Sequence, residues 1–315
     1  MIKPHTDRKK GGRKFPFLAL FLLVFFLGSA VVAFKMLPFF QARQFTKLSR
    51  YTLVLNQDPL TVISFDWKDT KAFIFSIPDT VHVNAAFGYG LLPIQSVYKT
   101  GQLDRRGKEV LSLTLQNVLG VPISAVATQT RPLPVAIDKS SRLQLLRLLA
   151  DKDLNPLDTA AFLWHWLKLR SDKIVVFKLD RVSAFEEVIL PDGRKVQTFD
   201  FDKLDRILAD AVSSSTIREV QMRLGIVNTT DVDGLGAKVG RLISLSGGNV
   251  ISVQSAPEKI ATCRFDYSAD KFAASYTVRF LQNAFTCDVQ KIVVLDSRFD
   301  GVFYLGSRIG EQFKN

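Results

Sequence analysis

The chain has 315 residues, a formal net charge of +12, 47% hydrophobic residues and 23% charged residues. This composition excludes a largely disordered chain, and the length suggests two folded units. The basic charge favours an anionic partner such as an envelope polymer or a lipid phosphate. Nucleic acid is disfavoured because the densest basic run, in residues 1–14, adjoins an apolar segment. An ordinary solvated surface with an excess of Lys and Arg explains the charge equally well.

The apolar segment Phe15–Phe34 predicts a single transmembrane helix. Its twenty residues carry no charge and reach about 30 Å as a helix, the thickness of a bilayer core. The basic residues before it place the N-terminus in the cytoplasm, so the rest of the chain is expected outside. A signal peptide cleaved after Ala33 is the alternative. We favour the uncleaved anchor at the cell membrane, because the apolar stretch is long and apolar residues resume at Met36.

After a stalk at residues 35–50, the pattern predicts two α/β domains, residues 51–212 and 217–315, joined by a polar linker at 213–216. The strands expected in the first domain are 51–56, 61–67, 72–77, 121–130 and 173–180, and its helices are 108–119, 140–150, 156–170 and 201–212. In the second domain we expect strands at 220–228, 249–255, 262–267, 290–296 and 302–306, with helices at 234–246 and 269–284. The second domain is therefore predicted to be a β-α-β-β-α-β-β sandwich.

The motifs of the second domain resemble the LytR C-terminal domain. Gly225–Val239 is similar to that family's strand, turn and Gly-Leu helix start, and Asp300–Arg308 is similar to its last strand. The turn residues Asn228, Thr229 and Gly234 are candidate ligand-binding residues, because exposed N–H groups at a helix start can hold an anion. The alternative is a purely architectural turn, in which the Asn side chain bonds to the backbone.

Three motifs of the first domain resemble the LytR-CpsA-Psr catalytic domain. They are Ser76–Val83, Asn84–Gly90 and Asn117–Ile123, in that family's order. The resemblance implies Mg²⁺-dependent transfer of a glycopolymer from a polyprenyl pyrophosphate carrier to the cell wall, behind a single membrane span. Such chemistry needs Arg side chains to neutralise pyrophosphate and acidic side chains to hold the metal.

The sequence departs from that family where the chemistry would lie. Pro78 runs directly into Asp79, without the Arg that the family places between them, and the later Arg cluster has no counterpart. We therefore predict a degenerate, non-catalytic domain, with Asp79 as a weak catalytic candidate and no metal or cofactor; Mg²⁺ is expected only if the transferase interpretation holds. The candidate ligand-binding arginines are Arg105, Arg106 and Arg131.

Three functions follow as hypotheses. The first is a membrane-anchored envelope protein that binds or scaffolds cell-wall glycopolymer or a polyprenyl phosphate lipid. The second is an active phosphotransferase, which requires Arg105, Arg131 and Arg142 to converge on Asp79. The third is a regulatory membrane partner of such an enzyme.

The remaining chemistry-bearing residues are few. Cys263 and Cys287 flank a predicted helix, and in an exported α/β domain they form either a disulfide or two buried thiols. The three histidines have no metal-ligand spacing. His82 follows Asp79 by three residues, so both could line one pocket.

Overall fold

The computed structural model describes Phe21, Phe25, Phe45 and residues 50–128, 143–179, 184–292 and 296–314. The chain divides into two units, Met1–Arg43 and Gln44–Asn315. In the first unit, Phe21 and Phe25 are helical and exposed. Of the helices within the described ranges, none has the length and apolarity needed to cross a membrane. The predicted span Phe15–Phe34 lies outside the described residues, apart from Phe21 and Phe25.

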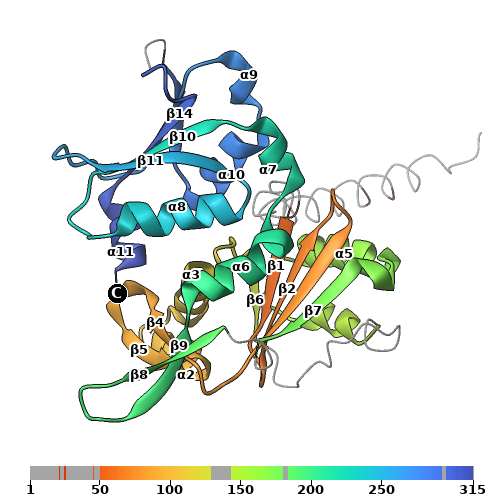
Figure 1. Ribbon diagram of the computed structural model, residues 1–315. Helices are drawn as coiled ribbons and strands as arrows, with labels where there is room; N and C mark the ends of the chain where they lie inside the picture. The colour runs from red at the N-terminus through yellow and green to blue at the C-terminus, as the bar shows by residue number, and fades with distance from the viewer. Residues whose placement is uncertain are drawn as a thin grey trace, which may run out of the picture. The chain divides into compact units, whose positions relative to one another are not determined.

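The second unit begins with a five-stranded sheet in the order β6-β1-β2-β3-β7 (Figure 1). Its strands are β1 (Arg50–Leu55), β2 (Leu60–Asp66), β3 (Lys71–Ile77), β6 (Ala125–Ala127) and β7 (Ile174–Lys178). The first three strands are antiparallel neighbours, whereas β6 runs parallel to β1 and β7 parallel to β3. The central strands are buried along nearly their whole length, because both faces of this sheet are covered.

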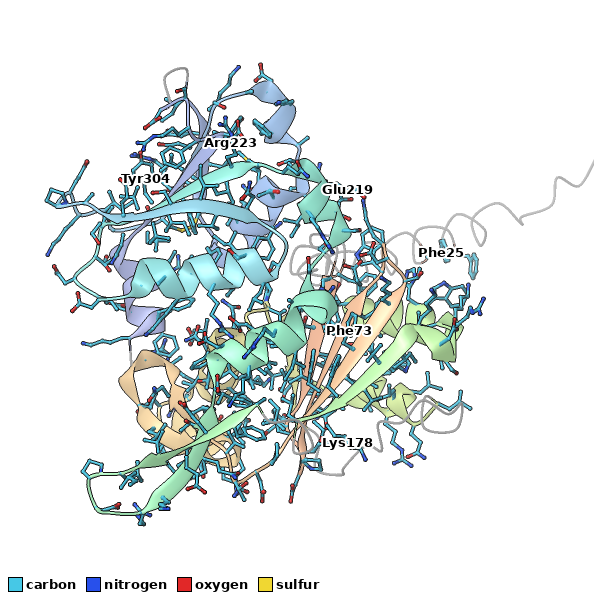
Figure 2. All side chains as sticks on the ribbon, in the orientation of Figure 1. Phe25, Phe73, Lys178, Glu219, Arg223 and Tyr304 are labelled. Carbon is cyan, nitrogen blue, oxygen red and sulfur yellow. A yellow bond between two sulfur atoms is a disulfide. The ribbon has the colours of Figure 1, made fainter. Side chains whose placement is uncertain are left out.

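Alternate side chains of these strands enter two different cores. Leu53 and Ile63 face a core that is closed by helix α5 (Pro156–Lys168) and the 3₁₀ segment η2 (Leu145–Ala150). Val54 and Val62, their neighbours in sequence, face the opposite core, which is closed by α3 (Gly107–Leu119) and α6 (Phe201–Val212). Phe73 on β3 belongs to this second core (Figure 2).

Two hairpins and two further helices complete this part of the chain. The hairpins are β4–β5 (His82–Ala85 and Gly90–Pro93, with the 3₁₀ turn η1 at Ala86–Gly88) and β8–β9 (Phe185–Ile189 and Lys195–Phe199). The helices are α2 (Ile94–Leu103) and α7 (Ser215–Val220), and the 3₁₀ turn η3 (Ser171–Lys173) precedes β7.

A second five-stranded sheet, in the order β11-β10-β14-β12-β13, forms the C-terminal part. Its strands are β10 (Arg223–Asn228), β11 (Asn249–Ser255), β12 (Arg264–Tyr267), β13 (Asp288–Lys291) and β14 (Gly301–Leu305), and its helices are α8 (Leu235–Leu245), α9 (Asp270–Ala273), α10 (Tyr276–Phe285) and α11 (Ser307–Phe313). Helix α8 packs closely on β11, since a Cβ at Gly236 would lie 2.6 Å from the Val253 side chain. The elements follow the expected β-α-β-β-α-β-β order, with the second helix divided in two.

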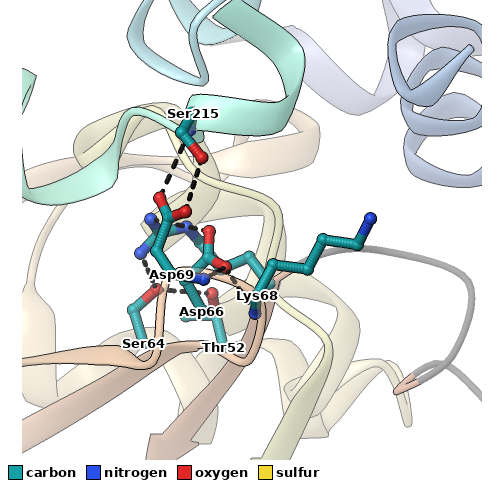
Figure 3. A network of polar contacts seen from close by, with 7 residues as sticks. Thr52, Ser64, Asp66, Lys68, Asp69 and Ser215 are labelled. Carbon is teal, nitrogen blue, oxygen red and sulfur yellow. Dashed lines mark hydrogen bonds and ion pairs between the residues drawn. The ribbon is translucent and has the colours of Figure 1, made fainter. Parts of the chain in front are cut away.

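A buried polar network underlies the turn between β2 and β3 (Figure 3). The guanidinium of Arg50 donates to Ser64 at 3.1 Å and to Asp66 at 3.4 Å. Burial lowers the pKa of Arg50 and raises that of Asp66, while the attraction between the two charges opposes both shifts. Asp69 extends the network by accepting hydrogen bonds from the hydroxyl and the N–H of Ser215, at the start of α7.

The structure differs from the sequence-based prediction at several elements. Ser215 and Thr216, predicted as linker, lie in α7, and the predicted helix 269–284 is interrupted because Ser275 caps a new helix at the N–H of Val278. The predicted strand 121–130 is short, with only Ala125–Ala127 paired. The β4–β5 hairpin, strands β8 and β9, and helices α2 and α11 were not predicted.

Candidate functional site

A cavity of about 530 Å³ lies among α3, α6, α8 and the two hairpins. Its lining combines apolar side chains with charged and amide groups. The lining residues are His82, Val83, Asn84, Leu91, Asn117, Val118, Glu186, Val188, Thr198, Phe199, Phe201, Ala237, Lys238 and Arg241. A cavity of this size, with apolar surface and several polar groups in its lining, is typical of a site for a small organic ligand.

The end of α3 forms one wall of the cavity. Gly120 ends this helix in the left-handed conformation (φ 62°), which glycine adopts without strain. The guanidinium of Arg241 donates to the last carbonyls of the helix, at 2.6 Å to Asn117 and 2.9 Å to Val118. It also binds the Asp205 carboxylate through Nε at 2.8 and 2.9 Å. Arg241 is therefore a positioning residue whose charge is already neutralised.

Lys238, on the same helix α8, is the second cation of the cavity lining. Its amine is half-buried, and burial lowers its pKa from the ordinary value. Nζ donates to the carbonyl of Phe313 at 3.5 Å, and no carboxylate pairs with it among the residues that the structure describes. A half-buried ammonium without a counter-ion favours binding of an anion.

Asn117 supplies an acceptor. Its side-chain oxygen is buried and has no hydrogen-bond partner within the described part of the chain. A buried carbonyl oxygen without a donor is costly, so a hydroxyl or N–H of a bound molecule would stabilise it.

The hairpins supply the rest of the wall. Gly193 turns the β8–β9 hairpin with a φ of 82°, a conformation that glycine adopts without strain. Val188 and Phe199 contribute apolar surface, and Glu186 contributes a carboxylate that accepts from Thr198 at 3.4 Å. On β4, the ring nitrogen Nδ1 of His82 lies 3.1 Å from the Thr80 carbonyl.

The structure separates the candidate residues of the first domain. Asp79 lies in the turn after β3 and does not line the cavity, whereas His82 does. Arg105 is exposed in the turn between α2 and α3, and Arg106 packs 3.8 Å over the Phe87 ring and binds Glu109. Arg131, like Arg142, lies outside the described residues.

The turn before α8 is held by its own side chains. Asn228 accepts from the N–H of Thr230 at 3.0 Å and donates to the Val232 carbonyl at 3.0 Å. The hydroxyl of Thr229 donates to the Leu305 carbonyl at 2.7 Å. Gly234 has a φ of 71° at the N-cap of α8. These groups serve the architecture of the turn, and anion binding there stays a prediction.

Cys263 and Cys287 are joined by a disulfide, with their Cα atoms 4.9 Å apart. Both are buried in the core beneath the C-terminal sheet. The bond has a structural position, away from the cavity lining.

Eight of the described arginines are paired with carboxylates. The pairs are Arg50–Asp66, Arg106–Glu109, Arg170–Asp172, Arg194–Asp192, Arg223–Asp300, Arg241–Asp205, Arg264–Asp266 and Arg298–Asp296. Within the described ranges, no group of three or more His, Cys, Asp or Glu side chains is placed to hold a metal ion.

Sequence reasoning did not identify the two cations of the cavity. Lys238 and Arg241 are three residues apart and share one side of α8, a spacing that the sequence does display. On a helix of unknown surroundings, such a pair is typical of a solvated surface. Only the placement of α3 and α6 gives it a cavity to line.

Comparison with solved structures finds proteins of the LytR-CPS2A-psr class, the class that the motifs of the first domain resemble. The matches include TagV of Bacillus subtilis (13% identity, TM-score 0.36, 50% of this chain and 94% of TagV). They also include YwtF (TagT) with bound octaprenyl pyrophosphate lipid (14%, 0.36, 52% and 90%) and yvhJ of Bacillus subtilis, titled a transcriptional regulator (14%, 0.33, 50% and 94%). No protein-family model and no curated protein matches the chain. At these identities and TM-scores the matches carry no conclusion about activity.

Proposed function

We propose that this chain is a non-catalytic, membrane-anchored protein of the cell envelope that binds an amphiphilic anion in the cavity beside Lys238. The proposal includes a span at Phe15–Phe34, with the folded unit outside the cytoplasm. The expected ligand class is a polyprenyl phosphate or the lipid-linked end of a glycopolymer.

The observation that carries the proposal is the lining of the cavity. Leu91, Val118 and Val188 offer apolar surface. Among the residues that the structure describes, Lys238 has no carboxylate partner and the Asn117 side-chain oxygen has no donor. A ligand with an apolar chain, an anionic group and a hydroxyl satisfies all three. Glu186 opposes an anion, but its carboxylate is exposed to water, so its field is screened.

The non-catalytic part of the proposal is supported by the state of the charged groups. Arg106 is held by Glu109 and by the Phe87 ring, and Arg241 is held by Asp205 and the end of α3. Guanidinium groups engaged in this way are not available as a fork for pyrophosphate oxygens. The aspartate that the transferase alternative needs, Asp79, lies outside the cavity lining.

The test is calorimetric titration of the full chain in detergent with octaprenyl pyrophosphate, the lipid named in the TagT structure. We expect binding, and we expect Lys238→Met to weaken it by roughly tenfold or more, because a charge-assisted contact in an apolar site is lost. The matched control is Lys259→Met, which removes an exposed lysine paired with Asp231 and should leave the affinity unchanged.

Two results would overturn the proposal. If the wild type and Lys238→Met bind the lipid with equal affinity, the cavity beside Lys238 is not the binding site. Magnesium-dependent cleavage of the polyprenyl pyrophosphate to polyprenyl monophosphate by the full chain would contradict the non-catalytic assignment and restore the transferase alternative.

A further inference from the structure

Helix α5 and the adjoining η2 segment present large apolar side chains to solvent. Trp164 is 62% exposed and Leu167 39% on α5, and Leu146 and Leu149 are 40% and 51% exposed on η2. We call these four residues the α5 face. Because the inward residues of both segments, such as Leu148 and Trp166, fill one core under the same side of the sheet, the α5 face points away from that sheet. Exposed apolar groups gathered on one side mark an interaction surface.

Among the described residues near the α5 face, the exposed charged groups without a partner of opposite charge are lysines. Of the nearby acids, Asp153 binds Lys108 and Asp172 binds Arg170. Asp151 and Asp158 accept from the backbone N–H groups of Asp153 and Phe45. The exposed cations Lys152, Lys168 and Lys173 have no carboxylate partner among the described residues. The net field of this face therefore suits an anionic surface.

Lys168 and Trp164 form the pair typical of a water–lipid boundary. The Lys168 ammonium lies 3.6 Å over the Trp164 ring. An indole ring has an apolar body and a polar N–H, and it is favoured at the headgroup level of a bilayer. A lysine beside it can lay its apolar stem along the ring and keep its charge at the phosphates.

The length of chain ahead of α5 allows this face to reach the bilayer that holds the predicted anchor. Phe45 stacks on His165 of α5 with ring centroids 5.5 Å apart, and its N–H bonds Asp158 at the start of the same helix. Ten residues separate Phe45 from Phe34, the end of the predicted span. Ten residues reach at most about 36 Å, so the tether allows α5 to reach the surface of a bilayer that holds that span.

We propose that the α5 face docks onto the lipid headgroup region of a bilayer that contains anionic lipid. The inference rests on the membrane anchoring included in the proposed function. Trp164, Leu146, Leu149 and Leu167 enter the interface, and the bordering lysines meet the lipid phosphates. The occupant is the membrane itself, selected by the tether length and by the cationic border.

The experiment measures quenching of Trp164 in the full chain, reconstituted into vesicles of phosphatidylcholine and phosphatidylglycerol. A phosphatidylcholine with a nitroxide near the top of its acyl chain serves as quencher. Trp164→Phe assigns the signal, since Trp166 is buried and Trp67 partly buried. We expect strong quenching that is lost in Trp164→Phe and weakens in vesicles of phosphatidylcholine alone.

A double variant tests the face directly. Leu146→Glu with Leu149→Glu should reduce the quenching of Trp164 to the level of Trp164→Phe. The matched control, Leu103→Glu with Ile189→Glu, charges two residues that are 83% and 67% exposed and should quench as the wild type does. Circular dichroism verifies that both variants are folded. Absence of Trp164 quenching in the wild type, or equal loss in both double variants, would overturn the docking proposal.

Failure of docking and failure of the proposed function have separate readouts. Extraction of the vesicles with alkaline carbonate reports the anchor: release of the full chain would contradict the span. Quenching of Trp164 on addition of vesicles to the released chain still decides docking by itself. Lys238→Met, which tests the cavity, should leave the Trp164 signal unchanged.

Discussion

The guanidinium of Arg241 on α8 holds the carboxylate of Asp205 on α6, with Nε 2.8 and 2.9 Å from its two oxygens. The same guanidinium donates to the carbonyl groups that end α3. Three helices that border the cavity are thus joined by one planar side chain. Because a lysine has no such fork, it cannot replace these contacts.

We therefore expect Arg241→Lys and Arg241→Met to lower the free energy of unfolding, Arg241→Met by about 2 kcal/mol, because Asp205 and two carbonyls lose their donor. Urea denaturation measures the change. The control is Arg298→Met, whose ion pair with Asp296 is exposed and should leave the midpoint almost unchanged. A midpoint for Arg241→Met equal to that of the control would contradict the role assigned to this residue.

The contact between Asp69 and Ser215 caps a helix from a distant part of the chain. Helix α7 begins at Ser215, and the preceding residue, Ser214, makes no side-chain cap; Asp69 accepts from the Ser215 N–H instead. A double-mutant cycle of Asp69→Asn and Ser215→Ala should give a coupling energy of about 1 kcal/mol. Additive effects of the two changes would show that the contact contributes nothing to stability.

The disulfide between Cys263 and Cys287 closes a loop with a sequence separation of 24. Replacing both cysteines by serine should lower the free energy of unfolding by about 3 kcal/mol, since the unfolded chain regains the freedom of that loop. Thermal unfolding with and without a reductant measures the effect. Reductant should lower the Tm of the wild type and leave the Tm of the double variant unchanged. A wild-type Tm that does not change with reductant would argue against the bond.

Arg223 and Asp300 predict an acid-side pH dependence. Hydrogen bonds from Arg223 lower the pKa of the Asp300 carboxyl. Because the folded pKa lies below the unfolded value of about 3.9, the stabilisation is complete above that pH and is lost as the pH falls through the folded pKa. Below about pH 4, the free energy of unfolding of the wild type should fall more steeply than that of Asp300→Asn. Arg223→Met should flatten the profile in the same way; an unchanged slope in both variants would refute the linkage.

The sequence predicted those helices and strands whose ends are set by residues adjacent in sequence, such as helix caps. Asn155 caps α5 by accepting from the N–H groups of Leu157 and Asp158, and Pro156 occupies the first turn, as the sequence suggests. The β4–β5 hairpin was missed because Phe87 takes a φ of 63° there, a conformation that sequence patterns rarely assign to an aromatic residue.

The site was harder to foresee than the fold. Its lining comes from segments between His82 and Arg241 that are far apart in sequence, so no short motif contains it. The candidate residues Asp79 and Asn228 lie outside the cavity lining, although the motifs of the first domain contribute His82, Asn84 and Asn117 to it. Sequence order identified the strands and helices, but the cavity depends on how α8 packs against α3 and α6.

The packing of Phe45 ties the N-terminal segment mechanically to the folded unit. Its ring is 4% exposed and packs against Tyr51, Phe65 and His165, so the folded unit takes part of its core from the chain ahead of the first strand. A pull on the N-terminal segment is therefore borne by stacked rings and the Asp158 hydrogen bond before it reaches β1. A protease that cuts just after Phe45 would remove this core residue together with the chain segment that precedes it.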